Sequence, residues 1–388
     1  MLNKAKTIHD KLINLRRTIH KHPELGFQEI KTSALIANTL RELGIEFQPN
    51  VGKTGVVAHL GDGNGPKIGI RADMDALPIL EANEVEYKSQ VPGKMHACGH
   101  DSHTAMLLGV AMLLKDEPIA GEVRLLFQPA EEGNVNGTSG AQEMIKEHAL
   151  DDLDTVIALH VNGTLDCGQI ALISGYSHAN TDRMYAKIIG KGGHGAVPHE
   201  AIDPIFMTAP ILTAIHGIVS RRVNPIMPAV ITVGRLAGGN TANVIPDTVE
   251  LELTIRSTTK EVQKLLMDEI EKALSIARLL GGDYTCDVEY GYPALHNDEH
   301  VVRWIEKVGS DLLGSDNIKQ RPLGMGGEDF SFMVNSCTGA MFSLGVKDPN
   351  GEPKYLHHSE FDIDENALPI GAALLAETAL RFVRGELS

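Results

Sequence analysis

Short apolar runs of the kind found in strands alternate with segments of helical periodicity over the first part of the chain. The strand-like runs are TGVVAHL, KIGIRAD, EVRLLFQ and TVIALHV. Between them, the spacing of apolar residues predicts helices near 103–115 and 138–148. Strands that alternate with helices are typical of α/β folds, because parallel strands need a crossover connection. We therefore predict an α/β fold with a mostly parallel sheet.

The pattern changes near residue 178. The segments DRMYAKIIGKG, AVITVGRL and TVELELTIRS alternate apolar and polar residues or are rich in β-branched residues, and helical stretches lie near 203–221 and 259–280. A helix near 298–314, the strand-like AMFSLG and a last helix near 365–383 then resume the first pattern. The middle segment is typical of an α+β sandwich.

The length of the chain also argues for two domains. Single hydrophobic cores stop growing at about 250 to 300 residues, whereas this chain has 388. Because the first pattern resumes after the second, we predict one domain formed by residues 1–177 and 296–388. The α+β sandwich of residues 178–295 would be inserted into it.

Ionisable residues follow three of the predicted strands. Asp73 and Asp75 follow KIGIRA, Glu131 and Glu132 follow EVRLLFQPA, and His160 closes TVIALH. Ligands of open parallel sheets bind at the carboxyl ends of the strands. We therefore expect these side chains to share one site.

Charge and cysteine content narrow the classes of function. The chain has 35 basic and 51 acidic residues, a net charge of −16, with the two signs interspersed. Nucleic acids and anionic membranes need clustered Lys and Arg, so we expect neither as a partner. The sequence contains no apolar run of about 18 residues, and its start resembles a charged amphipathic helix rather than a signal peptide. Four widely spaced cysteines suit a reducing compartment, and we expect a cytoplasmic protein.

Side chains that bind transition metals are concentrated in a few short strings. MHACGHDSHT supplies Cys98 and His100, TVIALH ends in His160, and LHHSEFD offers His357 and His358. Taken singly, these residues also fit ordinary positions: a buried thiol, solvated histidines and a histidine of the core. Thiolate, imidazole and carboxylate are ligands of zinc and similar ions. Their joint occurrence favours a metal site.

The string PAEEG places Glu131 and Glu132 side by side after an apolar strand. Adjacent acids most often lie on a solvated surface, but these two are expected at a strand end. One carboxylate of such a pair can bind a metal while the other takes a proton from metal-activated water and returns it to the leaving amine. This division of roles suits the hydrolysis of an amide.

The order of these strings along the chain resembles a known family. Together with HKHPELGFQE, RADMDALPI, GKGGHGAVPH, NVIPD and GGEDFS, they make the sequence similar to the dinuclear aminoacylase and carboxypeptidase-like metallopeptidases. The matching branch includes hippurate hydrolases, plant auxin-conjugate hydrolases and bacterial N-acetyl amino acid deacetylases. The resemblance implies a mostly parallel-sheet metallopeptidase catalytic domain, with the inserted sandwich as a lid and dimerisation domain.

The resemblance also implies a role for each candidate ligand. Cys98 would bridge two metal ions, with His100 and His160 completing one of them. Glu132 and His358 would complete the other. The donors suit two divalent ions per subunit, with zinc or manganese expected and nickel or cobalt also compatible.

In the same family pattern, Glu131 would be the general base. Other branches have a His-x-Asp pair where this chain has Asp73-Met74-Asp75, so His100 would replace the missing histidine ligand. Asp75 would then orient a ligand, which supports metal binding. Asp73 would be structural rather than a ligand.

The inserted domain carries further residues that match family positions. His194, within GGHGA, matches a histidine that in related enzymes reaches an active site, often across a dimer, to stabilise the developing oxyanion. Asn243 and Arg256 match positions near the substrate carboxylate, although a surface salt bridge also fits Arg256. Gly326 and Gly327 would let the backbone approach the substrate, unless they are ordinary turn glycines. A homodimer through the lid is implied.

The function that this resemblance implies is hydrolysis of N-acyl L-amino acids, such as acetyl or benzoyl derivatives, to a carboxylate and a free amino acid. A dipeptidase or carboxypeptidase acting on small peptides is the alternative, and the departure at Asp73 favours acyl-amino acids. A non-catalytic small-molecule binding protein is a third possibility. It would be expected to lack the base or a ligand, and all of them are present.

Overall fold

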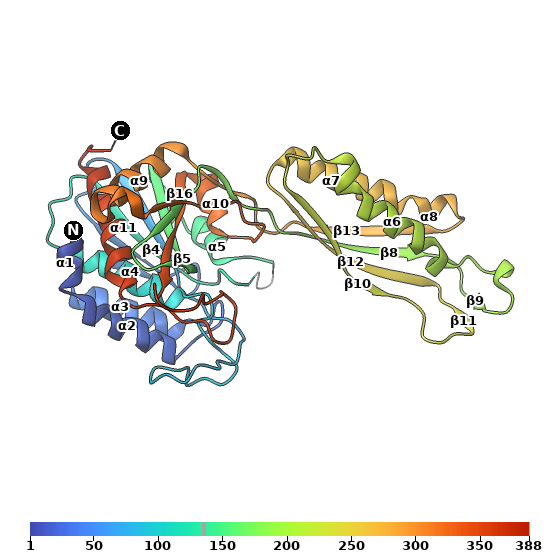
Figure 1. Cartoon of the computed structure of the whole chain (residues 1–388), viewed down its shortest axis with the longest axis horizontal. Coiled ribbons are helices and arrows are strands. Elements are labelled where there is room, and N and C mark those ends of the chain that lie inside the picture. Colours follow the sequence, from blue (N-terminus) through green and yellow to red (C-terminus); the bar gives the residue numbers. More distant parts are fainter. Residues whose placement is uncertain (134–136, 388) are drawn as a thin grey trace. The chain divides into compact units, whose positions relative to one another are not determined.

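The structure, a computed structural model, describes residues 1–133 and 137–387. The chain divides into two compact units (Figure 1). The first comprises residues 1–177, 296–323 and 329–388, and the second comprises residues 178–295 and 324–328. The short segment 324–328, which the sequence pattern placed in the first unit, thus groups with the second.

An eight-stranded sheet forms the centre of the first unit. Its strands are β1 (Glu46–Val51), β2 (Gly55–Leu60), β3 (Lys67–Asp73), β4 (Glu122–Gln128), β5 (Thr155–Asp166), β6 (Ile170–Leu172), β15 (Ile318–Gln320) and β16 (Thr338–Lys347). They lie in the order β1-β2-β4-β3-β5-β16-β6-β15. β3 pairs in parallel with β4 and β5, and β16 pairs in parallel with β5, whereas β2 is antiparallel to β1 and β4. The central strands confirm the predicted mostly parallel sheet.

Helices cover this sheet. They are α1 (Leu2–Lys6), α2 (His9–Lys21), α3 (Ile30–Glu42), α4 (His100–Leu114), α5 (Gly140–Lys146), α9 (Glu299–Leu313), the 3-10 turn η2 (Ser315–Asn317), α10 (Phe330–Ser336) and α11 (Ala367–Val383). α4 and α11 pack against each other and against β3. Every residue of α4 except Met112 is buried, and a helix enclosed on all sides needs apolar residues on every face. This explains the continuous apolar run AMLLGVAMLL that follows its polar first turns.

Three strands deliver polar residues to one edge of this sheet. Asp73, the last residue of β3, lies opposite Gln128, the last residue of β4. The parallel register of β3 and β5 brings His160 level with Asp73. β5 continues past His160 to Asp166 instead of ending there, because β16 pairs with it along this stretch. Glu131 follows the end of β4 at the same edge.

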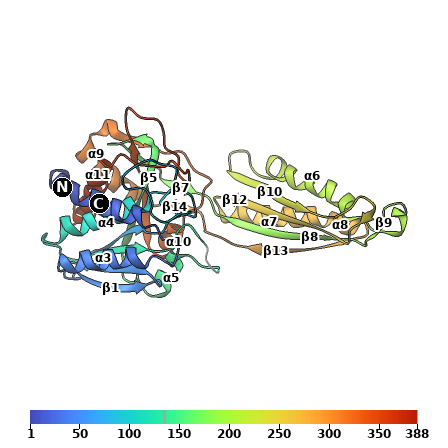
Figure 2. The same ribbon diagram turned by 90° about the horizontal axis from the view of Figure 1, so that it is seen from below.

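The second unit is an antiparallel sheet with helices packed against it (Figure 2). Its strands β8 (Asp182–Ile189), β10 (Ala229–Ala237), β12 (Thr248–Ser257) and β13 (Asp283–Glu289) lie in the order β10-β12-β8-β13. Its helices are α6 (Pro204–Arg222), α7 (Lys260–Leu274), α8 (Ile276–Leu279) and the 3-10 turn η1 (Pro198–Glu200). A two-stranded ribbon joins β9 (Gly193–His194) to β11 (Val244–Ile245). Alternate residues of β12 are buried, as the period of a strand with one covered face requires.

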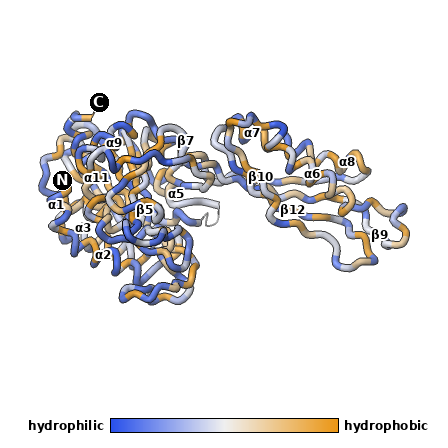
Figure 3. The backbone as a smooth tube through the Cα atoms, viewed as in Figure 1, coloured by the Kyte–Doolittle hydropathy of each residue, from blue (hydrophilic) through white to orange (hydrophobic). Residues whose placement is uncertain are grey.

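Each unit has its own apolar core. The first is formed by α4, α11 and the central strands, and the second by β8, β12, α6 and α7. Apolar stretches, orange in Figure 3, run along these elements. Where the chain passes from one unit to the other, β7 (Gly175–His178) pairs with β14 (Leu295–Asn297). Within the described residues, the helices lack the combination of length and apolar character needed to cross a membrane.

Arg71 joins three elements of the first unit from inside β3. Its Nη1 donates to Asp73 Oδ2 (2.6 Å), and its Nη2 donates to Asp329 Oδ1 (2.7 Å) just before α10. Its Nε donates to Gln128 Oε1 (2.8 Å) at the end of β4. The side chains of Arg71, Asp73 and Asp329 are fully buried. Breaking a buried ion pair by removing one partner is costly, because the remaining charge has no water to solvate it.

We expect Arg71→Met to lower the free energy of unfolding by about 3 to 5 kcal/mol, because two buried carboxylates lose their counter-ion. Urea unfolding of the metal-free chain measures this loss. Arg303→Met removes an exposed guanidinium from its pair with Glu299 and should cost less than about 1 kcal/mol. Equal losses in the two variants would contradict the prediction.

Candidate metal centre

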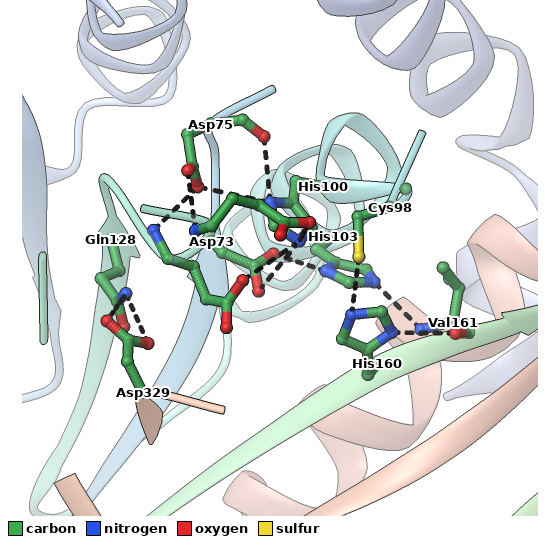
Figure 4. A network of polar contacts seen from close by, with 12 residues as sticks. Asp73, Asp75, Cys98, His100, His103, Gln128, His160, Val161 and Asp329 are labelled. Carbon is green, nitrogen blue, oxygen red and sulfur yellow. Dashed lines mark hydrogen bonds and ion pairs between the residues drawn. The ribbon is translucent and has the colours of Figure 1, made fainter. Parts of the chain in front are cut away.

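Metal-binding side chains from separate segments converge at the carboxyl edge of the sheet in the first unit (Figure 4). Among the groups whose ligand atoms all lie within 4.8 Å of one another, three overlap: Cys98, His100 and His160; Cys98, Glu132 and His357; and His100, Glu131 and Glu132. The shared members join the groups into one cluster. Four of the five predicted ligands therefore lie together, namely Cys98, His100, Glu132 and His160.

A glycine lets the loop before α4 carry two of these residues. Gly99 is the N-cap of α4 and has a left-handed φ of 87°. A Cβ at this position would lie 2.4 Å from Val161 Cγ2, so only glycine fits both the conformation and the space. The sharp bend places Cys98 and His100, on either side of it, at the same cluster.

His100 presents one ring nitrogen to the cluster and uses the other to hold itself in place. Its Nδ1 lies 2.9 Å from the carbonyl oxygen of Asp75, to which it donates. Its Nε2 is buried, has no hydrogen-bond partner, and lies 3.9 Å from Glu132 Oε1 and 4.0 Å from Glu131 Oε2. Burial opposes protonation of this ring, but Asp73, Asp75 and Glu132 outweigh it and raise its pKa to about 10. The surroundings of Nε2 therefore favour a positive charge, which a cation would supply.

Cys98 and His160 face each other across the cluster. His160 donates from Nδ1 to the carbonyl of Val161 (2.9 Å), which leaves Nε2 3.4 Å from Cys98 Sγ. Burial and His103 lower the pKa of His160 to about 3, so its imidazole is neutral. Burial and the nearby Glu132 and Glu131 raise the pKa of the Cys98 thiol well above its usual value. A thiol, neutral imidazoles and carboxylates are a donor set that fits a divalent transition metal.

The loop after β16 contributes His357 to the cluster rather than His358. His357 has a left-handed φ of 61°, donates its N–H to the Ala97 carbonyl (2.8 Å), and lies with Nε2 3.0 Å from Glu132 Oε1. His358 is exposed, and its Nδ1 accepts the N–H of Glu360 (3.2 Å). The family pattern assigned the fifth ligand to His358, and the geometry favours its neighbour because His357 groups with Cys98 and Glu132.

Asp75 connects both glutamates to His100. Its Oδ1 accepts the backbone N–H of Glu131 and its Oδ2 accepts that of Glu132, each at 3.0 Å. The Nδ1 of His100 lies 3.3 Å from the same Oδ1. Glu131 is 7% exposed, so a base at this position would work largely out of contact with solvent. Asp75 therefore fixes the relative positions of a candidate base and a candidate ligand.

His103 lies beside the cluster and was not singled out from the sequence. Its Nδ1 donates to Asp73 Oδ1 (2.5 Å), and its Nε2 accepts the N–H of Val161 (3.0 Å). Asp73, His100 and His103 are close enough to hold an ion, but both nitrogens of His103 are already used. Its position three residues after His100, one helical turn along α4, was the signal for its proximity.

His194, Asn243 and Arg256 lie in the second unit, and their roles toward a substrate remain predictions. His194 is exposed in β9, and the N–H of Gly195 donates to the carbonyl of Asn243 (2.9 Å), so the first two residues lie together. Arg256 is at the opposite end of the sheet, in the last residues of β12. Its guanidinium is partly buried, and burial lowers its pKa against the opposing effect of Asp182.

The two predicted glycines also belong to the second unit. The carbonyl of Gly326 accepts the N–H of Ala179 (3.1 Å), and a Cβ on Gly327 would lie 2.3 Å from Thr181 Cγ2. Neither glycine has a left-handed φ. Close packing within the unit is therefore sufficient to explain Gly327.

The sequence is similar to a described family and to curated proteins. The model of "Peptidase family M20/M25/M40" matches residues 69–381. Thermostable carboxypeptidase 2 of Saccharolobus solfataricus is 40% identical, over 98% of this chain and 97% of its own length. IAA-amino acid hydrolase ILR1-like 4 of Arabidopsis thaliana is 38% identical, over 98% of this chain and 88% of its own length. N-acetyl-L-cysteine deacetylase of Bacillus subtilis is 38% identical, over 97% of this chain and 89% of its own length.

Solved structures match the fold over its whole length. A putative aminohydrolase from methicillin-resistant Staphylococcus aureus has a TM-score of 0.94 and 33% identity, covering 99% of each chain. The YXEP protein of Bacillus subtilis, described as a dinuclear metal binding peptidase, has a TM-score of 0.86 and 34% identity, covering 98% of this chain and 99% of its own.

The geometry of the loop after β16 predicts unequal effects of its two histidines. We expect His357→Ala to weaken binding of a divalent metal by at least about 10- to 100-fold, the range seen when even an orienting partner of a ligand is lost. His358→Ala should bind like the wild type, because the His358 side chain is exposed and its Nδ1 already accepts the N–H of Glu360. Metal titration and elemental analysis measure both, and the reverse order would restore His358 as the candidate.

Proposed function

Because the chain belongs to the peptidase family M20/M25/M40, we propose that it is a metal-dependent amidohydrolase that cleaves N-acyl L-amino acids to a carboxylate and a free amino acid. The observation that carries this proposal is the pair of neighbouring glutamates anchored by Asp75 beside a cluster of thiol and imidazole donors. Both glutamates have an oxygen within 4.8 Å of a ligand atom of His100, and Glu132 also groups with Cys98 and His357. Glu132 would therefore bind metal, and Glu131 would act as the base.

We assign two divalent ions to the cluster. Cys98 would bridge them, His100 and His160 would complete one ion, and Glu132 and His357 would complete the other. The printed description of the similar YXEP protein as dinuclear supports this count. The mixed donors suit zinc or manganese, and nickel or cobalt are compatible. When bound, such ions lower the pKa of water and polarise the scissile carbonyl.

Glu131 is the proposed general base. It takes a proton from the attacking water and later gives a proton to the leaving nitrogen, so that amide and water become a carboxylate and an amine. His194 would stabilise the negative charge that develops on the carbonyl oxygen. Asn243 and Arg256 would bind the carboxylate of the amino acid, where a guanidinium offers a pair of parallel donors.

The proposed substrates carry acetyl, benzoyl or similar acyl groups, which hydrolysis converts to carboxylates. The similarity to IAA-amino acid hydrolases and to N-acetyl-L-cysteine deacetylase supports them. A carboxypeptidase or dipeptidase activity is the second candidate, favoured by the 40% identity with thermostable carboxypeptidase 2. Assays of N-acetyl and N-benzoyl amino acids beside dipeptides separate the two.

The four cysteines are all free, which supports a cytoplasmic location.

The second unit supports a homodimer as the active form. His194 lies on the β9–β11 ribbon, and Arg256 lies eight residues after Thr248, the first residue of β12. Eight strand residues span about 26 Å, whereas two residues of substrate span about 7 Å. One substrate could not contact both residues of the same chain. If both act on it, a second copy has to supply one of them.

We expect Glu131→Gln to retain its metal and to lose turnover by about 10²- to 10⁴-fold, because the amide cannot accept the proton. Elemental analysis and steady-state kinetics on the same sample check the two halves of this statement. Turnover near the wild-type rate would remove Glu131 as the base.

Mixing two inactive variants tests the shared site. Glu131→Gln and His194→Ala should each be nearly inactive, and hybrid dimers formed by refolding them together should contain one complete site. About a quarter of the wild-type activity is then expected, because half of the dimers are hybrids with one working site of two. If hybrids verified by mass recover no activity, the shared site is wrong. His194 and Glu131 of one site would then come from the same chain, or His194 would take no part in the site.

A further inference from the structure

Two buried carboxylates hold three consecutive backbone amides at the end of β4. Glu29 Oε1 accepts the N–H of Ala130 at 2.9 Å. Asp75 accepts the next two N–H groups, those of Glu131 and Glu132, at 3.0 Å each. The proposed mechanism gives Glu29 no part. Yet Glu29 is fully buried, and the residue that it binds, Ala130, directly precedes the proposed base Glu131.

The amide that Glu29 holds belongs to a strained residue. Ala130 has a φ of 46°, and an L-residue in the left-handed region costs about 1 to 2 kcal/mol. Such a conformation persists only when its surroundings enforce it. Gly140 donates its N–H to the Ala130 carbonyl (3.1 Å), and a Cβ on Gly26 would lie 2.9 Å from the Ala130 Cβ. Glu29 supplies the contact on the N–H side of the turn.

Glu29 is itself fixed by its neighbours. It immediately precedes α3, and its Oε2 accepts the hydroxyl of Thr54 at 2.6 Å. Burial and the nearby Asp75 carboxylate raise the pKa of Glu29 to about 7. A buried acid that is this costly to ionise needs its hydrogen-bond partners. The backbone of Ala130 and the hydroxyl of Thr54 are the two partners described above.

We propose that Glu29 is a positioning residue for Glu131, acting by holding Ala130 in the left-handed turn that aims the base. The proposal rests on the proposed function of Glu131. The φ of Ala130 sets the direction in which the chain enters Glu131, and a general base has to lie within about 2.6 to 3.2 Å of the proton that it takes. A displacement of about 1 Å in a catalytic group can cost about 10²-fold in rate.

Kinetics of the metal-loaded enzyme provide the first test. Glu29→Met fills the space without an acceptor and should lower kcat by about 10- to 100-fold, with KM and bound metal changed by less than about twofold. Glu29→Gln keeps an oxygen for the Ala130 N–H and should restore most of kcat. Thr54→Val, which loosens Glu29 without removing it, is the milder variant and should lower kcat less.

Glu122→Ala is the matched control, because it removes a buried carboxylate from the opposite end of β4. It should leave kcat unchanged. A fall in kcat for Glu29→Met that only matches the loss of bound metal, or that Glu122→Ala reproduces, would overturn the proposal.

Ala130→Gly tests the turn itself. Glycine adopts a positive φ without strain, so a turn that contains it needs less support from Glu29. The fall in kcat caused by Glu29→Met should therefore be clearly smaller in the Ala130→Gly background than in the wild type. An equal fall in both backgrounds would show that Glu29 does not act through Ala130 and would overturn the proposal.

Hydrogen exchange on the metal-free chain gives a readout that does not depend on catalysis. In Glu29→Met the amides of residues 130–132 should exchange at least about tenfold faster, whereas Glu122→Ala should leave them protected. Unchanged protection in Glu29→Met would overturn the positioning role even if kcat falls. A wild-type enzyme inactive on every N-acyl amino acid would instead refute the proposed function, and the exchange result would still decide the role of Glu29.

Discussion

The carboxylate of Asp75 is the contact on which the rest of the candidate centre depends. It lies two residues beyond β3, accepts the amides of Glu131 and Glu132, and lies against His100. Strand β3, the turn after β4 and the start of α4 are therefore held to one another by a single side chain. Because that side chain is 1% exposed, water does not compete for its hydrogen bonds. The rigid sheet thus sets the distance between the proposed base and the proposed ligands.

Two groups of ionisable residues lie side by side at this edge and differ in how completely their atoms are paired. Arg71 and His103 both donate to the carboxylate of Asp73, and His103 also accepts the backbone N–H of Val161, so the three form a bonded network in the core. His100, by contrast, leaves a buried nitrogen without a partner among carboxylates. Burying such a set is costly in the absence of a cation, so metal binding would also stabilise the fold. Pairing, rather than residue type, separates the structural group from the candidate metal site.

The division into two units separates the proposed chemistry from recognition. The cluster and Glu131 come entirely from the first unit, while the polar residues matched to substrate contacts lie at two distant ends of the second. Similar proteins named as a carboxypeptidase and as a hydrolase of IAA-amino acids differ by only two percentage points in their identity to this chain. A shared centre is therefore compatible with different substrates, and the groups that surround it have to make the choice.

The sequence alone determined the mostly parallel sheet, the family and the chemical classes of the donors. Each of these depends on local periodicity or on residue types in order, which a linear pattern records. The structure places His357 rather than His358 beside Glu132, in a loop held by a left-handed backbone at His357 and by a bond from its N–H to Ala97, far away in sequence. It also showed that His103 is fully bonded, that β5 continues past His160, and that Gly327 packs on Thr181. These features depend on which atoms are in contact in the folded chain. Two residues of the same type, even adjacent ones, can have entirely different contacts.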